Sequence, residues 1–212
     1  MKSRKLTCVV ALILFAAVPT ALASTTWYVN GVTGRDSNNC LSAMTACKTI
    51  GHAISLAASG DSIKVAAATY AENLTIGLSL TLTGSGASTT IIDGGRVSRV
   101  VTINSSSAHV TLSGLTIRNG HAFAGGGISN VGILTLVTSN VSGNAVSCSG
   151  FSCTVAGGGI YNSGGTITIQ SSTISGNNAT SSESGVRNGR CGAAGGGNYN
   201  LVLKFVNTMT YN

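Results

Sequence analysis

The acidic side chains are the first residues to consider for chemistry, because the chain of 212 residues has only five of them. They are Asp36, Asp61, Glu72, Asp93 and Glu183, and no two are close in sequence. Hydrolysis of a glycosidic bond needs two carboxylates that flank the bond to be cleaved. A calcium-dependent lyase needs several carboxylates around the ion. Asp61, Glu72 and Asp93 fall at expected strand starts and corners, which also favour a structural role. The acids therefore predict no catalytic residue and no metal site, and nothing in the sequence calls for a cofactor.

Three arginines form the candidate binding site. Arg96, Arg99 and Arg118 would lie on one flank if the strands stack about 4.8 Å apart in successive coils. Such a flank could bind an acidic glycan, and solvated surface is the alternative. His109 and His121 lie near the same segments, and no G-x-S-x-G turn accompanies the abundant serines.

The cysteines predict two short disulfide loops. Cys40 is close to Cys47, and Cys148 is close to Cys153, while Cys191 is left over. No pair has C-x-x-C spacing, and the three histidines are far apart, so zinc is not indicated.

Residues 1–23 are typical of a secretory signal peptide. Lys2, Arg4 and Lys5 precede an apolar core, and Ala21-Leu22-Ala23 forms a cleavage site. A membrane anchor is the alternative, but the core is short for a span. We therefore expect a secreted or cell-surface protein that keeps its disulfides and has no transmembrane span after cleavage.

Glycine-rich units of a solenoid position these residues. Units of about 20 residues begin at Gly125, Gly157 and Gly195 and contain short strands such as Thr166-Ile167-Thr168-Ile169. The alternation points one row of side chains into a core and the other to solvent. We predict an all-β, parallel β-helix, in which equivalent asparagines stack as structural ladders. The two ladders comprise Asn130, Asn162 and Asn200, and Asn144, Asn177 and Asn212.

The N-terminal part is expected to cover the open end of the solenoid. Apolar residues from Ile50 to Ala58 have helical spacing, with Thr49 as the N-cap and Gly60 as the stop. We therefore divide the chain into a capping segment (24–60) and β-helix coils (61–212). Two stretches, 145–156 and 178–194, break the period and are predicted to be inserted loops that carry binding.

The repeats resemble those of secreted right-handed parallel β-helix proteins of the pectate-lyase-like superfamily. Pairs such as Gly126-Gly127-Ile128 with Val141-Ser142-Gly143-Asn144 are similar to polymorphic outer membrane protein repeats. The stricter repeat has Phe where this chain has an aliphatic residue. The third unit departs further, with Asn198 in place of Ile and no capping element before Asn212. This favours a truncated or frameshifted member, with a short natural form as the alternative.

The function that we predict from the sequence is an exported, non-catalytic, adhesin-like protein that binds a glycan or a host or cell-surface protein along one flank. The alternative is a polysaccharide-active enzyme, either a pectate-lyase-like lyase or a glycoside hydrolase. The outward-facing threonines are also a feature of ice-binding solenoids. The alternative is that threonine simply suits exposed positions of strands. The scattered basic residues and few aromatics exclude specific nucleic-acid binding. The sequence leaves the oligomeric state open.

Overall fold

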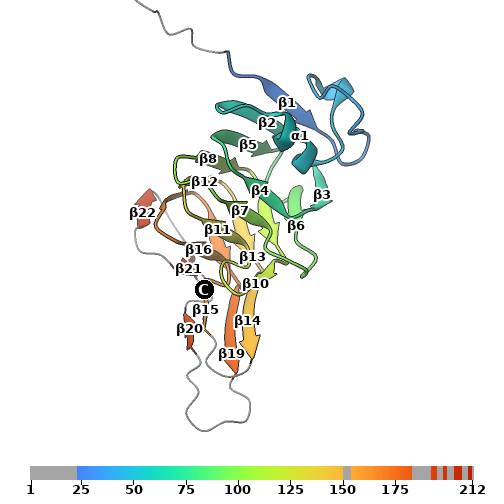
Figure 1. The fold of residues 1–212 in the computed structure, drawn as a ribbon. Coiled ribbons are helices and arrows are strands. Elements are labelled where there is room, and N and C mark those ends of the chain that lie inside the picture. The colour runs from blue at the N-terminus through green and yellow to red at the C-terminus, as the bar shows by residue number, and fades with distance from the viewer. Residues whose placement is uncertain are drawn as a thin grey trace, which may run out of the picture.

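The computed structural model describes residues 23–149 and 154–182, together with short strands at 192–194, 198–199, 203–206 and 210–211. Its strands wind into coils that stack along one axis (Figure 1). Each coil contributes one strand to each of three sheets, and strands from successive coils pair in parallel. The predicted parallel β-helix is confirmed.

Three sheets form the body of the β-helix. The seven-stranded sheet comprises β1 (Thr26–Val29), β2 (Asp61–Val65), β5 (Leu80–Gly84), β8 (His109–Ser113), β12 (Ile133–Val137), β17 (Thr166–Gln170) and β22 (Leu203–Val206). The six-stranded sheet comprises β3 (Ala68–Ala71), β6 (Thr90–Asp93), β9 (Thr116–Arg118), β13 (Asn140–Ser142), β18 (Thr173–Ser175) and β23 (Thr210–Tyr211). The five-stranded sheet comprises β4 (Leu74–Ile76), β7 (Val101–Ile103), β11 (Ile128–Asn130), β16 (Ile160–Asn162) and β21 (Asn198–Tyr199).

The core is built from rows of aliphatic side chains that repeat from coil to coil. In the seven-stranded sheet, Leu82 pairs with Leu112, and Leu112 pairs with Leu136. All three side chains are fully buried. The residues between them point outward, so alternation in the sequence becomes one apolar row and one polar row.

The described parts of the two period-breaking stretches are strands, and there the prediction of loops was wrong. β14 (Ala145–Ser149) pairs with β10 (His121–Ala122) and with β19 (Asn178–Ser182), and β15 (Thr154–Ala156) pairs with β20 (Gly192–Ala194). The insertions of neighbouring coils stack on one another in parallel, as the coils themselves do. Their backbone groups are therefore paired rather than left to solvent.

The described asparagines hydrogen-bond across coils. Asn130 Nδ2 donates to Asn162 Oδ1 at 2.7 Å, and Asn144 Nδ2 donates to Asn177 Oδ1 at 2.9 Å. Asn130, Asn144 and Asn162 are buried, so these amides satisfy one another and nearby backbone groups inside the coil. Asn200 and Asn212 lie outside the described residues.

The repeated glycine triplets are explained by close backbone contact. Gly127 N donates to Gly159 O at 3.0 Å, where the triplets of two coils stack. A Cβ atom on Gly126 or Gly127 would clash with carbonyl oxygens of the next coil. Gly125 and Gly157 also have φ values of 61° and 63°, which favour glycine.

A helix covers the first coil, as the apolar spacing predicts. α1 (Ile50–Leu56) buries Ile50, Ala53 and Ile54, and a short 3-10 helix, η1 (Ala43–Thr45), precedes it. The Thr49 side chain caps α1, and Glu72 accepts hydrogen bonds from Ile50 N and Gly51 N. The helix ends at Leu56 and not at Gly60, because Ala57 already has extended backbone.

Candidate functional site

On one flank of the β-helix, the connections between strands become longer from each coil to the next along the axis. The connection from the six-stranded to the five-stranded sheet grows from residues 72–73 through 94–100, 119–127 and 143–159 to 176–197. The connections from the seven-stranded to the six-stranded sheet stay short, at 114–115, 138–139 and 171–172. The longest insertions project away from the coils as β14 and β19 (Figure 1). We call the surface formed by the described residues of these five connections and by the ends of β6 and β9 the long-loop flank.

A carboxylate held by an arginine lies at the base of this flank. Asp93 ends β6 and pairs in register with Arg118, which ends β9. Asp93 Oδ2 accepts from Arg118 Nε at 2.8 Å and from Asn119 Nδ2 at 2.9 Å. Asp93 Oδ1 accepts from Gly95 N at 2.9 Å. Burial raises the pKa of Asp93, but these hydrogen bonds and the Arg118 charge outweigh it and leave the pKa below its ordinary value.

The three predicted binding arginines have different environments. The Arg118 side chain is 41% exposed, and of its nitrogens only Nε hydrogen-bonds to a described residue. Arg96 is exposed and has a left-handed backbone, with its N–H bonded to Asn119 O. Arg99 is half-buried and donates to the carbonyls of Ala124 and Gly125. The guanidinium of Arg99 thus clamps the next coil, while Arg96 and Arg118 remain accessible.

A histidine–serine pair lies further out on the same flank. His121 Nε2 and Ser147 Oγ are 2.7 Å apart, bridging β10 and β14. Beside them a hollow of about 420 Å³ is lined by Phe123, Ser147, Cys148, Ser149 and Thr180. Ser147 and Asn119 were not predicted as site residues. Their one signal in the sequence was position, since Ser147 follows the apolar Val146 and Asn119 is an asparagine at the end of the apolar segment around Ile117.

The other described acids stabilise the fold. Asp36 accepts hydrogen bonds from Lys48 N, Thr49 N and the Thr49 hydroxyl. Asp61 is buried and accepts from Trp27 Nε1, Thr25 N and Ala58 N. Glu72 caps α1, and Glu183 lies outside the described residues.

The cysteines nearest to a histidine are not available to bind a metal. The Sγ atoms of Cys40 and Cys47 lie within 4.8 Å of a His52 ring nitrogen. They form the predicted disulfide, so neither provides the thiolate that zinc requires. Cys148 is also disulfide-bonded, whereas its predicted partner, Cys153, and Cys191 lie outside the described residues.

The chemistry of the flank follows from the ionised Asp93. Its Oδ1 accepts a single hydrogen bond from the described residues, and the side chain is 16% exposed, so a water molecule can reach the remaining lone pair. The terminal nitrogens of Arg118 are free among the described residues to meet an anion. The arrangement places a carboxylate that can accept a proton beside a cation that can donate hydrogen bonds to an anion.

Comparison with solved structures identifies enzymes with a similar fold. A pectin methylesterase mutant in complex with a hexasaccharide matches with a TM-score of 0.51 and 18% identity, over 74% of this chain and 51% of that chain. The pectin methylesterase from Erwinia chrysanthemi matches with a TM-score of 0.44 and 18% identity, over 72% of this chain and 54% of that chain. This chain thus spans about half the length of each. No family model and no curated protein matches the chain.

The likeness shows that the chain has a right-handed parallel β-helix fold. The finer resemblance to polymorphic outer membrane protein repeats stays a prediction. The predicted non-catalytic, adhesin-like function is contradicted by the likeness to a pectin methylesterase, which favours the alternative of a polysaccharide-active enzyme. Among the described residues, no helix is both long and apolar enough to cross a membrane.

Proposed function

We propose that this chain is the β-helix of an exported enzyme that hydrolyses esters on an acidic polysaccharide at the long-loop flank. The observation that carries the proposal is the exposed edge of an ionised Asp93 beside the free guanidinium nitrogens of Arg118. The pectin methylesterases of similar fold supply the substrate class. The Cys40–Cys47 disulfide supports export, since disulfides persist in oxidising compartments.

Ester hydrolysis fits this site better than cleavage of the sugar chain. A glycoside hydrolase needs a second carboxylate about 5–9.5 Å from the first. Among the described residues, the remaining carboxylates of Asp36, Asp61 and Glu72 are bound to backbone amides elsewhere. A calcium-dependent lyase would need several carboxylates together. One carboxylate and one guanidinium suffice for attack of water on an ester.

The reaction begins when Asp93 Oδ1 removes a proton from water, and the resulting hydroxide attacks the ester carbonyl carbon. The carbonyl oxygen becomes an oxyanion, which the Arg118 guanidinium stabilises. The tetrahedral intermediate then collapses and the C–O bond to the alcohol breaks. The departing alkoxide takes the proton from Asp93, so the products are an alcohol and a carboxylic acid and the site is restored.

The direct test is to incubate the full chain with methyl-esterified polygalacturonate and measure methanol. We expect methanol release, without new reducing ends and without unsaturated sugar. New reducing ends would indicate a glycoside hydrolase, and unsaturated sugar would indicate a lyase; either would overturn the ester proposal. Methanol release that Ser147→Ala abolishes and Asp93→Asn preserves would move the site to the His121–Ser147 pair.

A further inference from the structure

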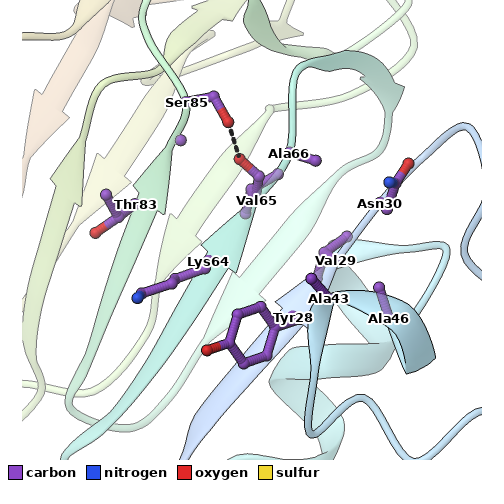
Figure 2. Close-up of a pocket in the computed structure, with 11 residues that line it drawn as sticks. Tyr28, Val29, Asn30, Ala43, Ala46, Lys64, Val65, Ala66, Thr83 and Ser85 are labelled. Carbon is purple, nitrogen blue, oxygen red and sulfur yellow. Dashed lines mark hydrogen bonds between the residues drawn. The ribbon is translucent and has the colours of Figure 1, made fainter.

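A second hollow lies on the outer face of the seven-stranded sheet, under the N-terminal segment. This pocket of about 270 Å³ lies at the ends of β1, β2 and β5, and its wall includes Ala43, the first residue of η1, and Ala46, its C-cap. Figure 2 shows Tyr28, Lys64 and Thr83 side by side on the three strands. They are register partners, since Tyr28 pairs with Lys64 and Lys64 pairs with Thr83. We call this hollow the N-terminal pocket.

The pocket joins an aromatic ring to an unpaired cation. Lys64 Nζ lies 5.8 Å from the centroid of the Tyr28 ring, within the range of a cation–π contact. No carboxylate pairs with Lys64 in the described part of the chain, where the ion pair is that of Asp93 with Arg118. The ammonium group at the mouth of this pocket is therefore free to meet an anionic ligand.

The remaining lining suits a sugar. Exposed Ala43 and half-buried Ala66 present apolar surface, which packs against the C–H groups of a sugar ring, whereas Val29 and Ala46 belong to the buried core. Ser85 Oγ donates to Val65 O at 3.2 Å, so its oxygen can still accept a hydrogen bond from a ligand hydroxyl (Figure 2). Asn30 Oδ1 is used by Val32 N and Thr33 N, which fixes the amide and leaves Nδ2 as a donor to the ligand.

We propose that the N-terminal pocket binds one uronic acid residue of an acidic polysaccharide. The sugar ring packs on the Tyr28 ring and the apolar wall, and its carboxylate meets Lys64 Nζ. Beside the pocket, the outward residues Thr81, Thr111 and Thr135 pair in register along the sheet. Their hydroxyls give neighbouring sugar units hydrogen-bonding partners. The pocket is thus a binding site on a different sheet from the proposed reaction site.

The wall of the pocket depends on a disulfide. Cys40 and Cys47 bracket η1, and Tyr28 N donates to Cys40 O while Cys47 N donates to Tyr28 O, both at 2.8 Å. This clasp holds Ala43 and Ala46 over the sheet. Binding in the pocket therefore requires the oxidised chain.

The test is a titration of the full chain with trigalacturonate. Binding is monitored through amide chemical shifts in NMR spectra and through calorimetry. Galactotriose is the matched neutral probe, because it has the same ring without the carboxylate. We expect saturable shifts at Tyr28, Lys64 and Ala43, and binding of galactotriose about tenfold weaker. Equal affinity for the two probes, or shifts confined to the long-loop flank, would overturn the proposal.

Variants of the two central side chains complete the test. Lys64→Met should weaken trigalacturonate binding about tenfold, whereas Lys48→Met, at an exposed lysine outside the pocket, should not. Tyr28→Leu should weaken binding about fivefold and Tyr28→Phe should not, because the ring is retained. Asp93→Asn should leave this binding intact, so the pocket and the reaction site are tested separately. Unchanged affinity in folded Lys64→Met would refute the site.

Discussion

Arg118 Nε lies 2.8 Å from Asp93 Oδ2, although the two residues are 25 positions apart in the sequence. The contact exists because β6 and β9 pair in a register that places both residues at the strand ends. The hydrogen bonds from Gly95, Arg118 and Asn119 lower the pKa of the carboxyl group, and the terminal nitrogens of the part-exposed Arg118 make no hydrogen bond to the described residues. The proposed reaction depends on both consequences.

The pH dependence of ester hydrolysis should reflect this ion pair. The pKa of Asp93 is below its ordinary value of 3.8, so the base stays ionised at that pH and activity declines only as pH falls below the ordinary aspartate value. Arg118→Gln removes the stabilising charge and should shift the acidic limb of the kcat/KM profile to higher pH. Arg35→Gln, at an exposed arginine far from the flank in sequence, is the control. An acidic limb that Arg118→Gln does not shift would show that Asp93 is not the titrating base.

The asparagine ladder should contribute measurably to stability. Asn144 Oδ1 accepts from Gly120 N, and its Nδ2 donates to Ile117 O and Asn177 Oδ1. Asn144→Ala leaves buried groups unpaired and should lower the free energy of unfolding by about 1–3 kcal/mol. The exposed Asn178→Ala should change it by less than about 0.5 kcal/mol. Urea denaturation measures both, and equal effects would argue against a ladder role.

Acid should weaken the attachment of the first strand to the first coil. Asp61 is 4% exposed, and this burial raises its pKa. Hydrogen bonds from Trp27, Ala58 and Thr25 lower the pKa by more than burial raises it, so the net shift is downward. A carboxylate with a lowered folded pKa stabilises the fold above its unfolded value, 3.8 here, and this contribution is lost as pH falls through the folded pKa.

Asp61→Asn should therefore flatten the loss of stability below about pH 4 and lower stability at neutral pH by about 1–3 kcal/mol. Fluorescence of Trp27, the single tryptophan, can follow unfolding at each pH. An unchanged acid limb in Asp61→Asn would assign the pH dependence to Asp36 and Asp93 instead.

The Cys40–Cys47 disulfide should stabilise the N-terminal cap. A loop with a sequence separation of 7 gives about 2–3 kcal/mol from chain entropy. The double variant Cys40→Ala/Cys47→Ala should thus lower Tm by about 5–10 °C. Calorimetry with and without reductant measures this change in Tm. If reductant lowers Tm equally in the double variant, the stabilising disulfide lies at another cysteine.

The solenoid could be predicted from the sequence because its signals are local. Alternation such as Thr166 to Ile169 and the glycine triplets need no knowledge of distant residues. The role of Arg99 could not be predicted, because its carbonyl partners Ala124 and Gly125 belong to the next coil. The connections between strands differ in length, so the sequence does not reveal which residues pair between coils. The pairing of Asp93 with Arg118 could not be predicted for this reason. The insertions were predicted as loops because their strands pair outside the three main sheets, with segments of neighbouring coils that are distant in the sequence.

The most direct test of the proposed reaction is the rate of methanol release from methyl-esterified polygalacturonate by Asp93→Asn and Asp36→Asn. Each carboxylate accepts three described hydrogen bonds and has a lowered pKa, so the two variants are matched in structural cost. We predict that Asp93→Asn loses at least about 100-fold in kcat, as loss of a general base does. Asp36→Asn should stay within about threefold of the unchanged chain. Equal activity in the two variants, or no methanol from the unchanged chain, would contradict the assignment.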